Sequence, residues 1–330
     1  MEGTDDGGGA DRAGDGPVRV HGVDFSAAAD DAGRKTWVAS GTVDPESDGL
    51  LVTDLRPLAE LAGLDGDGRG RRGAAREDAL PALAAWVRER DQSAAVGLDF
   101  PFGLPRFVVE ETGNDSWRSF ISEFPKSIGA GEGDAGDGGD ESDAAGDPVR
   151  AFAERCVGLT ERYGEGTYDK RRTDAAVGAR SPYGFIADTI AFYGMRDVLA
   201  PLADDVRFAP MDRTEGGWRP GTPPGPTVLE TYPAAVLDRL GLYRTSYKGG
   251  GESEATRRRR NAEGLVEAAE VAYKSGEGLA DAMVAEAGGD ALDAVAACVG
   301  AFAAWKRGYE TDVAAFDDPD AVALEGYIYG

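Results

Sequence analysis

The chain has 330 residues, of which 42% are hydrophobic, so it can bury one large core or two medium ones. Its 60 acidic and 35 basic residues give a formal net charge of −25, which disfavours contact with nucleic acid except where basic side chains gather. No apolar run reaches about 18 residues and residues 1–17 contain no apolar core, so we expect a cytoplasmic protein with no membrane-spanning helix and no secretory signal.

The first half of the chain predicts a tail, three strands and a helix. Residues 1–17 are rich in Gly, Asp and Glu, so we expect a disordered acidic tail. Val18–Phe25, Lys35–Val43 and Leu50–Leu55 predict strands, and the short links between them favour an antiparallel meander. Arg76–Arg90 gathers its apolar residues on one face and predicts a helix.

The middle of the chain predicts two more strands separated by a long insertion. Ala94–Phe100 is short and apolar, and because it follows a helix we expect it to run parallel to the first strand. The insertion contains a low-complexity acidic stretch at residues 129–147 and a predicted helix at Tyr183–Leu202. Thr227–Thr231 predicts the fifth strand.

The last part of the chain predicts helices at about Glu254–Tyr273 and Asp290–Arg307. The whole order indicates an α/β fold with a five-stranded mixed sheet, helices on both faces and a large insertion between strands 4 and 5. We expect residues 18–330 to form a single domain, with the acidic stretch at 129–147 as a solvated loop within it.

Carboxylates lie at the ends of several predicted elements. Asp24 and Asp99 each end an apolar strand, and Glu230 lies near the end of the fifth strand. If the first and fourth strands are adjacent and parallel, Asp24 and Asp99 meet at the edge where open α/β sheets bind ligands. Asp290 and Asp293 open the last helix three residues apart, so they share one helix face and can close this cluster from the side.

The available residue types favour a hard metal ion. The chain has one histidine, His21, which excludes a multi-histidine metal site, and two cysteines in apolar surroundings, Cys156 and Cys298, so we expect no cysteine-based metal site. Oxygen ligands alone favour Mg²⁺ or Mn²⁺. Two such ions about 3.5–4 Å apart activate water and stabilise the leaving oxygen in phosphodiester cleavage. Simpler roles stay open: the aspartates can cap turns and helices, and Glu230 can pair with an arginine.

Basic side chains gather in few places. Lys170, Arg171, Arg172 and Arg180 precede a predicted helix and are the candidate substrate-binding residues, because a nuclease must hold phosphates. Ordinary pairing with surface acids is the alternative. Lysine accounts for only six of the 35 basic residues, which together with the acidity is typical of halophilic proteins. At about 1 M salt the Debye length is about 3 Å, so local contacts decide binding.

Four motifs carry a resemblance to a known family. They are Gly-Val-Asp-Phe-Ser at 22–26, Leu-Asp-Phe-Pro-Phe-Gly-Leu-Pro at 98–105, Leu-Glu-Thr-Tyr-Pro-Ala-Ala at 229–235 and Asp-Ala-Leu-Asp-Ala-Val-Ala-Ala at 290–297. Together they resemble the family called domain of unknown function 429, described as predicted nucleases of the RNase H-like superfamily. The resemblance spans about Val18–Tyr329, with the acidic stretch outside it.

The resemblance implies an RNase H-like fold and a metal site. Asp24, Asp99 and Asp293 would be ligands, with Asp290 beside them, and Glu230 would belong to the catalytic set. RuvC-type relatives in the superfamily carry Glu on the fourth strand, where this chain has the shorter Asp99.

Our leading hypothesis is a Mg²⁺- or Mn²⁺-dependent nuclease that hydrolyses phosphodiester bonds of DNA or RNA. One alternative is a non-catalytic nucleic-acid or protein binding module with a vestigial RNase H-like site. Another is an actin/sugar-kinase-like phosphotransferase, which shares the core topology but carries Gly-rich phosphate loops that residues 22–26 match poorly.

Overall fold

The computed structural model of the protein describes residues 17–44, 46, 48–64, 74–124, 147–214, 216–268, 278–314 and 316–330. The predicted tail at residues 1–17 and the acidic stretch at 129–147 lie, apart from their last residue, outside the described residues. Within the described ranges, no helix combines the length and the apolar character needed to cross a bilayer.

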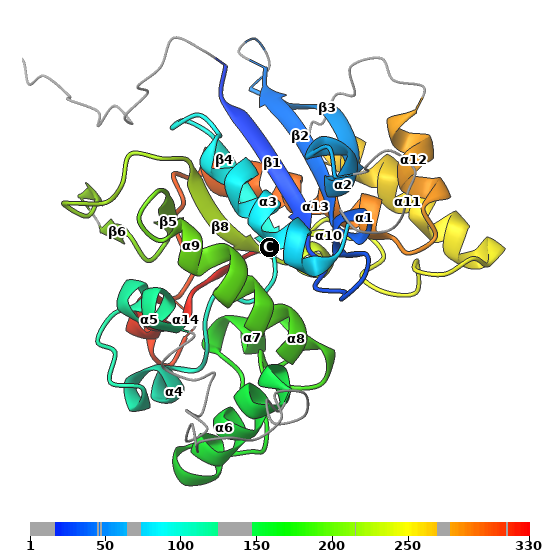
Figure 1. The fold of residues 1–330 in the computed structure, drawn as a ribbon. Helices are drawn as coiled ribbons and strands as arrows, with labels where there is room; N and C mark the ends of the chain where they lie inside the picture. Colours follow the sequence, from blue (N-terminus) through cyan, green and yellow to red (C-terminus); the bar gives the residue numbers. More distant parts are fainter. Residues whose placement is uncertain are drawn as a thin grey trace, which may run out of the picture.

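A mixed sheet of seven strands lies at the centre of the described structure (Figure 1). The strands are β1 (Arg19–Asp24), β2 (Trp37–Val43), β3 (Leu50–Pro57), β4 (Ala95–Asp99), β5 (Arg207–Ala209), β8 (Thr227–Thr231) and β9 (Ile328–Tyr329). They lie in the order β3-β2-β1-β4-β8-β5, and β9 pairs with the second half of β8. The first three strands are antiparallel, whereas β4 is parallel to both β1 and β8.

The five predicted strands form at the expected places, but the expected strand number is wrong. The sheet gains β5 and β9, which pair with successive halves of β8 on the side away from β4. These two strands have three and two residues, too few to show an alternating pattern in the sequence. A separate hairpin, β6 (Arg213–Thr214) with β7 (Gly217–Trp218), was also not predicted.

Helices cover both faces of the sheet, as predicted (Figure 1). One face packs against α10 (Pro233–Arg239), α11 (Glu252–Ala268), α12 (Leu279–Ala285) and α13 (Asp290–Lys306). The other face packs against α3 (Arg76–Arg88) and a continuous run of α8 (Ile186–Tyr193), a π-helical turn η3 (Gly194–Leu199) and α9 (Ala200–Leu202). The side chains between these layers form two separate hydrophobic cores, one on each face.

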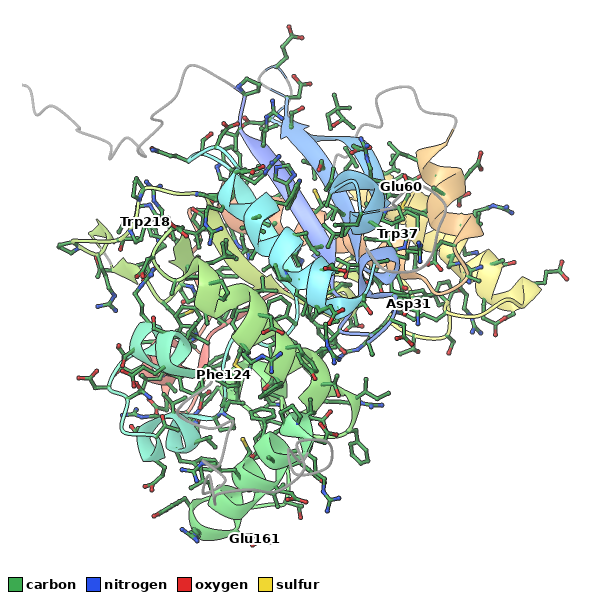
Figure 2. All side chains as sticks on the ribbon, viewed as in Figure 1. Asp31, Trp37, Glu60, Phe124, Glu161 and Trp218 are labelled. Atoms are coloured by element: carbon green, nitrogen blue, oxygen red, sulfur yellow. The ribbon has the colours of Figure 1, made fainter. Side chains whose placement is uncertain are left out.

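The insertion between β4 and β8 builds most of the remaining structure, below the sheet in Figure 1. It contains α4 (Arg106–Glu111), α5 (Trp117–Phe124), α6 (Pro148–Tyr163) and α7 (Arg172–Val177) in addition to the run from α8 to α9. Phe124, labelled in Figure 2, packs its ring 5.8 Å from the rings of Phe152 and Phe192, which joins three of these helices.

The short elements complete the chain. They are α1 (Ala32–Lys35), α2 (Leu58–Leu61), the 3-10 turn η4 (Pro319–Ala321) and α14 (Val322–Glu325). The segment from η4 to β9 brings the last residues of the chain back to the insertion and to the edge of β8.

Two glycines allow α13 to lie directly on the sheet backbone. A Cβ at Gly22 of β1 would lie 2.0 Å from the backbone N of Cys298 and 2.3 Å from the carbonyl of Ala294. A Cβ at Gly97 of β4 would lie 3.0 Å from the carbonyl of Ala297. Any side chain at Gly22 would therefore push the helix away. This close approach brings the start of α13 to the same edge as the ends of β1 and β4.

Candidate functional site

Asp24 and Asp99 occupy neighbouring positions at the ends of two parallel strands. The register of β1 with β4 pairs Asp24 directly with Asp99. Neighbouring strands lie about 4.8 Å apart, so the two side chains leave the sheet edge next to each other. The prediction that these strands are adjacent and parallel, and that the two aspartates lie side by side, is confirmed.

Asp293 reaches the same edge from the first turn of α13. It is buried, and its carboxylate accepts hydrogen bonds from the hydroxyl of Tyr247 at 2.7 Å and from Nζ of Lys248 at 2.7 Å. Asp290, one turn earlier, has an oxygen 3.9 Å from the same Nζ. We call Asp24, Asp99, Asp290 and Asp293 the carboxylate cluster.

The electrostatics of the carboxylate cluster are unbalanced. Asp24 is only 7% exposed, and no hydrogen bond or ion pair joins its carboxylate, or that of Asp99, to another described residue. Burial and then the charge of Asp293 raise the pKa of both carboxyls well above the usual range, and each also feels further acids of the cluster. Burial, with help from nearby acids including Asp293, raises the pKa of Asp290 to about 6. The cluster therefore resists full ionisation, because the protein supplies too little positive charge to compensate four buried carboxylates.

Lys248 is the one described cation that touches the cluster, and the sequence did not single it out. Burial opposes the charge on its ammonium, but the carboxylates of Asp293 and Asp24 outweigh this effect and raise its pKa. Its side chain remains about half exposed, which leaves it free to turn toward solvent. A sequence signal existed: Lys248 is one of six lysines in an arginine-rich chain and precedes three glycines.

The loop that carries Lys248 is held by a buried arginine. Arg258 of α11 donates hydrogen bonds to the carbonyls of Tyr247 at 2.6 Å and Gly249 at 2.7 Å, on either side of the lysine. It also donates to the carbonyl of Val284 at the end of α12. Arg258 therefore fixes the backbone at Lys248 while the lysine side chain keeps its freedom.

Glu230 belongs to a different group of side chains. Its carboxylate accepts hydrogen bonds from Nη1 and Nη2 of Arg171 at 2.7 and 2.6 Å, and from the backbone N–H of Phe102 at 3.0 Å. Arg171 also forms two bonds to Asp174, at 2.9 and 2.7 Å. We call Arg171, Asp174 and Glu230 the arginine network. Glu230 thus pairs with an arginine, which is the simpler role that the sequence left open, and its expected catalytic role stays a prediction.

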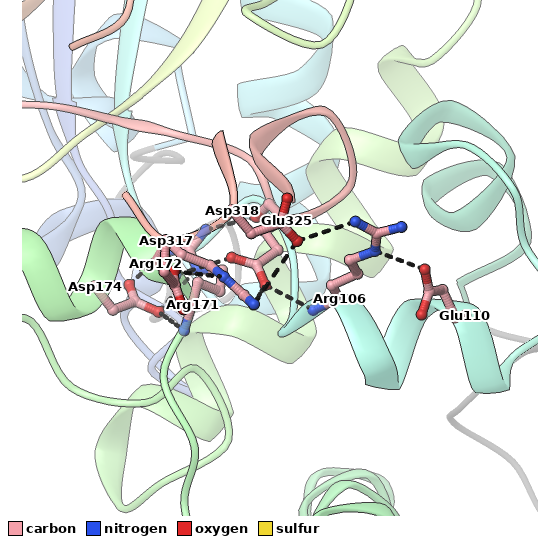
Figure 3. A network of polar contacts seen from close by, with 8 residues as sticks. All are labelled: Arg106, Glu110, Arg171, Arg172, Asp174, Asp317, Asp318 and Glu325. Atoms are coloured by element: carbon pink, nitrogen blue, oxygen red, sulfur yellow. Dashed lines mark hydrogen bonds and ion pairs between the residues drawn. The ribbon is translucent and has the colours of Figure 1, made fainter. Parts of the chain in front are cut away.

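Two of the predicted substrate-binding residues have partners within the protein. Arg171 is fully buried, so it cannot reach a phosphate. Arg172 donates to Glu325 of α14 at 2.6 Å and lies near Asp317 and Asp318, as Figure 3 shows. These contacts join the last part of the chain to the insertion, so both arginines stabilise the fold, and their expected role in substrate binding stays a prediction.

The other two predicted substrate-binding residues, Lys170 and Arg180, are exposed. Neither makes an ion pair with another residue in the described ranges. They remain available for a ligand, and their expected role stays a prediction.

The histidine and the cysteines lie outside the site. His21 is buried in β1, where Nδ1 lies 2.9 Å from the hydroxyl of Ser40, and burial lowers the pKa of its ring to about 3. Cys156 and Cys298 are free and buried.

The side chains of the carboxylate cluster are not arranged to coordinate a metal ion as they stand. In the described part of the chain, no group of three or more His, Cys, Asp or Glu side chains is arranged to hold a metal ion. Coordination would require side chains of the cluster to rotate and Lys248 to release Asp293.

Comparison of the chain with protein-family models, curated proteins and solved structures gave no match.

Proposed function

We propose that the protein is a nuclease with an RNase H-like fold, and that Asp24, Asp99 and Asp293 hold Mg²⁺ or Mn²⁺ during phosphodiester hydrolysis. The observation that carries the proposal is the pair of unpartnered carboxylates at the ends of β1 and β4, facing a third on α13. Two carboxylates about 4 Å apart repel by about 4 kcal/mol at an effective dielectric near 20. A divalent cation between the carboxylates would offset this repulsion. The single positive charge of Lys248 offsets it only in part.

The donor chemistry fits such an ion. All members of the carboxylate cluster offer hard oxygen ligands, which Mg²⁺ and Mn²⁺ prefer. Rotation of interface side chains on binding is common, and the half-exposed Lys248 has room to leave Asp293. When bound, a divalent ion would lower the pKa of a coordinated water and stabilise the charge that develops on the phosphate.

Residues around the carboxylate cluster would orient Asp293 and provide a positive charge for the phosphate of the substrate. The hydroxyl of Tyr247 holds one oxygen of Asp293 and so fixes the orientation of that carboxylate. Lys248, once released from Asp293, offers its ammonium to a phosphate oxygen of the substrate. Arg258 keeps the backbone of this loop in place throughout.

A second candidate is a non-catalytic nucleic-acid or protein binding module. The ion pair of Lys248 with Asp293, and the lack of a ready-made metal group in the described residues, favour it. In this alternative Lys248 is a permanent counterion and no metal binds.

A cleavage assay separates the two. Single-stranded and duplex DNA and RNA are incubated with the protein and Mn²⁺ or Mg²⁺ at low and high salt, beside Asp24→Asn and Asp99→Asn. We expect each variant to lose about 100-fold in rate, because each removes a charged ligand. The matched control is Asp91→Asn, because Asp91 is exposed and precedes β4 at the opposite end of the strand. Equal cleavage by all four proteins, or by none, contradicts the nuclease.

A further inference from the structure

An apolar hollow opens at the segment that follows β1. It has a volume of about 530 Å³, within the range of about 300–1,000 Å³ that small-molecule sites occupy. One wall is formed by residues 25–28, which continue directly from Asp24 at the end of β1. The opposite wall comes from the start of α8 in the insertion and consists of Phe185, Ile186, Asp188, Thr189 and Ile190, of which Asp188 is the one acidic residue. A ligand in the hollow would therefore contact Phe25, the residue that follows Asp24 in the sequence.

The rim of the hollow exposes large apolar side chains. Phe185 and Ile186, which line it, are 72% and 76% exposed. The ring of Tyr168 lies 5.7 Å from the ring of Phe185, at an angle of 37°. Among the described residues, most exposed large hydrophobic side chains come from this part of the insertion, and Tyr243 is the exception. Such a gathering marks a binding surface, because soluble proteins seldom expose contiguous apolar patches.

The backbone at Phe185 holds the ring in this exposed position. Its φ is 52°, in the left-handed region that bulky residues rarely adopt. The following residue begins α8, so the ring is displayed at a helix start and cannot fold back into the core without a change in the helix. The exposure of Phe185 is thus built into the fold.

Two free cations belong to the same segment. Lys170 follows Asp169, whose backbone N–H donates to the hydroxyl of Tyr183 at 2.9 Å, close to the turn that carries Phe185. Arg180 lies just before that turn. In a chain with a net charge of −25, two exposed cations without ion pairs to described residues favour an anionic ligand.

We propose that the hollow takes an unpaired nucleobase of single-stranded DNA or RNA. The base stacks on Phe185 and Tyr168, and neighbouring phosphates meet Lys170 and Arg180. Aromatic stacking is how proteins hold single strands without sequence preference, because every base presents a π-face. A stacked base also keeps its contact when salt screens the phosphates. This inference rests on the proposed nuclease and names its substrate class, since a base inside a duplex cannot enter the hollow.

The test is binding without cleavage. A fluorescein-labelled 12-nucleotide DNA strand, the same strand in a duplex, and a strand with abasic sites are titrated with the full chain in EDTA, and anisotropy is recorded. We expect the single strand to bind best, and the abasic strand about 10-fold more weakly, as the loss of one stack implies. Equal affinity for the three probes, or no binding of any, overturns the proposal.

Variants locate the site. Phe185→Ala should weaken single-strand binding about 10-fold, whereas Phe185→Trp should keep it, because a larger ring still stacks. Tyr243→Ala is the control, an exposed aromatic outside the hollow. Because Phe185 is exposed, its replacement should not unfold the protein, and circular dichroism checks this. Unchanged affinity of Phe185→Ala overturns the proposal.

The outcome separates this inference from the nuclease itself. Asp24→Asn should still bind the single strand in EDTA even though it does not cleave. Binding by every protein with cleavage by none refutes the nuclease alone. Cleavage with full affinity in Phe185→Ala refutes the nucleobase site alone.

Discussion

Two groups of buried acidic side chains lie at strand ends in this protein, and the protein balances them in opposite ways. In the arginine network, both carboxylates share the guanidinium of Arg171 and form several hydrogen bonds. In the carboxylate cluster, the ammonium of Lys248 forms ion pairs with Asp290 and Asp293 only, and the other two carboxylates have no hydrogen bond or ion pair with another described residue. We therefore propose the uncompensated carboxylates, and not the paired ones, as the binding site.

The largest change in the free energy of unfolding is expected when the arginine network loses its guanidinium. Arg171→Met leaves Asp174 and Glu230 buried without a countercharge, which typically destabilises a protein by about 3–5 kcal/mol. Urea denaturation measures the change in the free energy of unfolding. Arg150→Met is the control, because Arg150 forms an exposed ion pair on α6. A change of less than about 1 kcal/mol in Arg171→Met would show that this network is not a buried ion pair.

In the carboxylate cluster, removal of one side chain is expected to raise the free energy of unfolding. Asp24→Asn removes a buried carboxyl that lacks a partner and whose ionisation the fold disfavours, so the metal-free protein should gain about 1–2 kcal/mol in stability. Thermal unfolding in EDTA reads out this gain. With Mn²⁺ present the unaltered protein should be stabilised by binding and the variant should not. A lower stability of Asp24→Asn in EDTA would show that the carboxylate has a stabilising partner and would contradict this assignment.

A smaller effect, on the affinity for Mn²⁺, is expected from replacing Lys248. Lys248→Met removes the ammonium that lies 2.7 Å from Asp293, so Mn²⁺ no longer competes for that carboxylate. We expect calorimetry to show binding that is tighter by about 10-fold, which corresponds to about 1.4 kcal/mol. Weaker binding in Lys248→Met would mean that the lysine positions Asp293 for the metal and does not compete with it.

The smallest effect is a pH dependence with a defined sign. The pKa of Asp24 is raised by burial and by Asp293, so the folded state binds this proton more tightly than the unfolded state. This carboxyl therefore lowers the free energy of unfolding progressively as the pH rises from about 4, its pKa in the unfolded chain, to its pKa in the folded state. The same holds for Asp290, whose pKa of about 6 sets the window between about pH 4 and 6.

Melting curves of the metal-free protein from pH 4 to pH 8 read out this dependence. The gain in Tm of Asp24→Asn over the unaltered protein should therefore grow with pH. The corresponding difference for Asp91→Asn, at an exposed position, should stay flat. A gain in Asp24→Asn that shrinks as the pH rises would reverse the assigned direction of the pKa.

The sequence predicted the parts of the site that depend on local pattern and strand order. Apolar runs located β1 and β4, and a helix between them implied parallel pairing, which was enough to bring Asp24 and Asp99 together. The spacing of Asp290 and Asp293 likewise followed from helix geometry alone.

The parts that were missed depend on contacts between distant segments. Lys248 reaches Asp293 across 45 residues because Arg258 fixes its loop, and no periodic pattern records such a contact. Arg171 stands in a run of three basic residues that looks solvent-exposed. Its burial depends on Glu230, which lies 59 residues later in the chain. The two-residue strand β9 is likewise defined by its partner β8.

The most direct measurement is a crystal structure of the protein soaked in Mn²⁺, with anomalous scattering used to locate the metal. We expect anomalous density between the carboxylates of Asp24 and Asp99, with Lys248 turned away from Asp293. An unshifted Lys248–Asp293 ion pair with no density at this edge, at a Mn²⁺ concentration that supports cleavage, would contradict the proposed metal site.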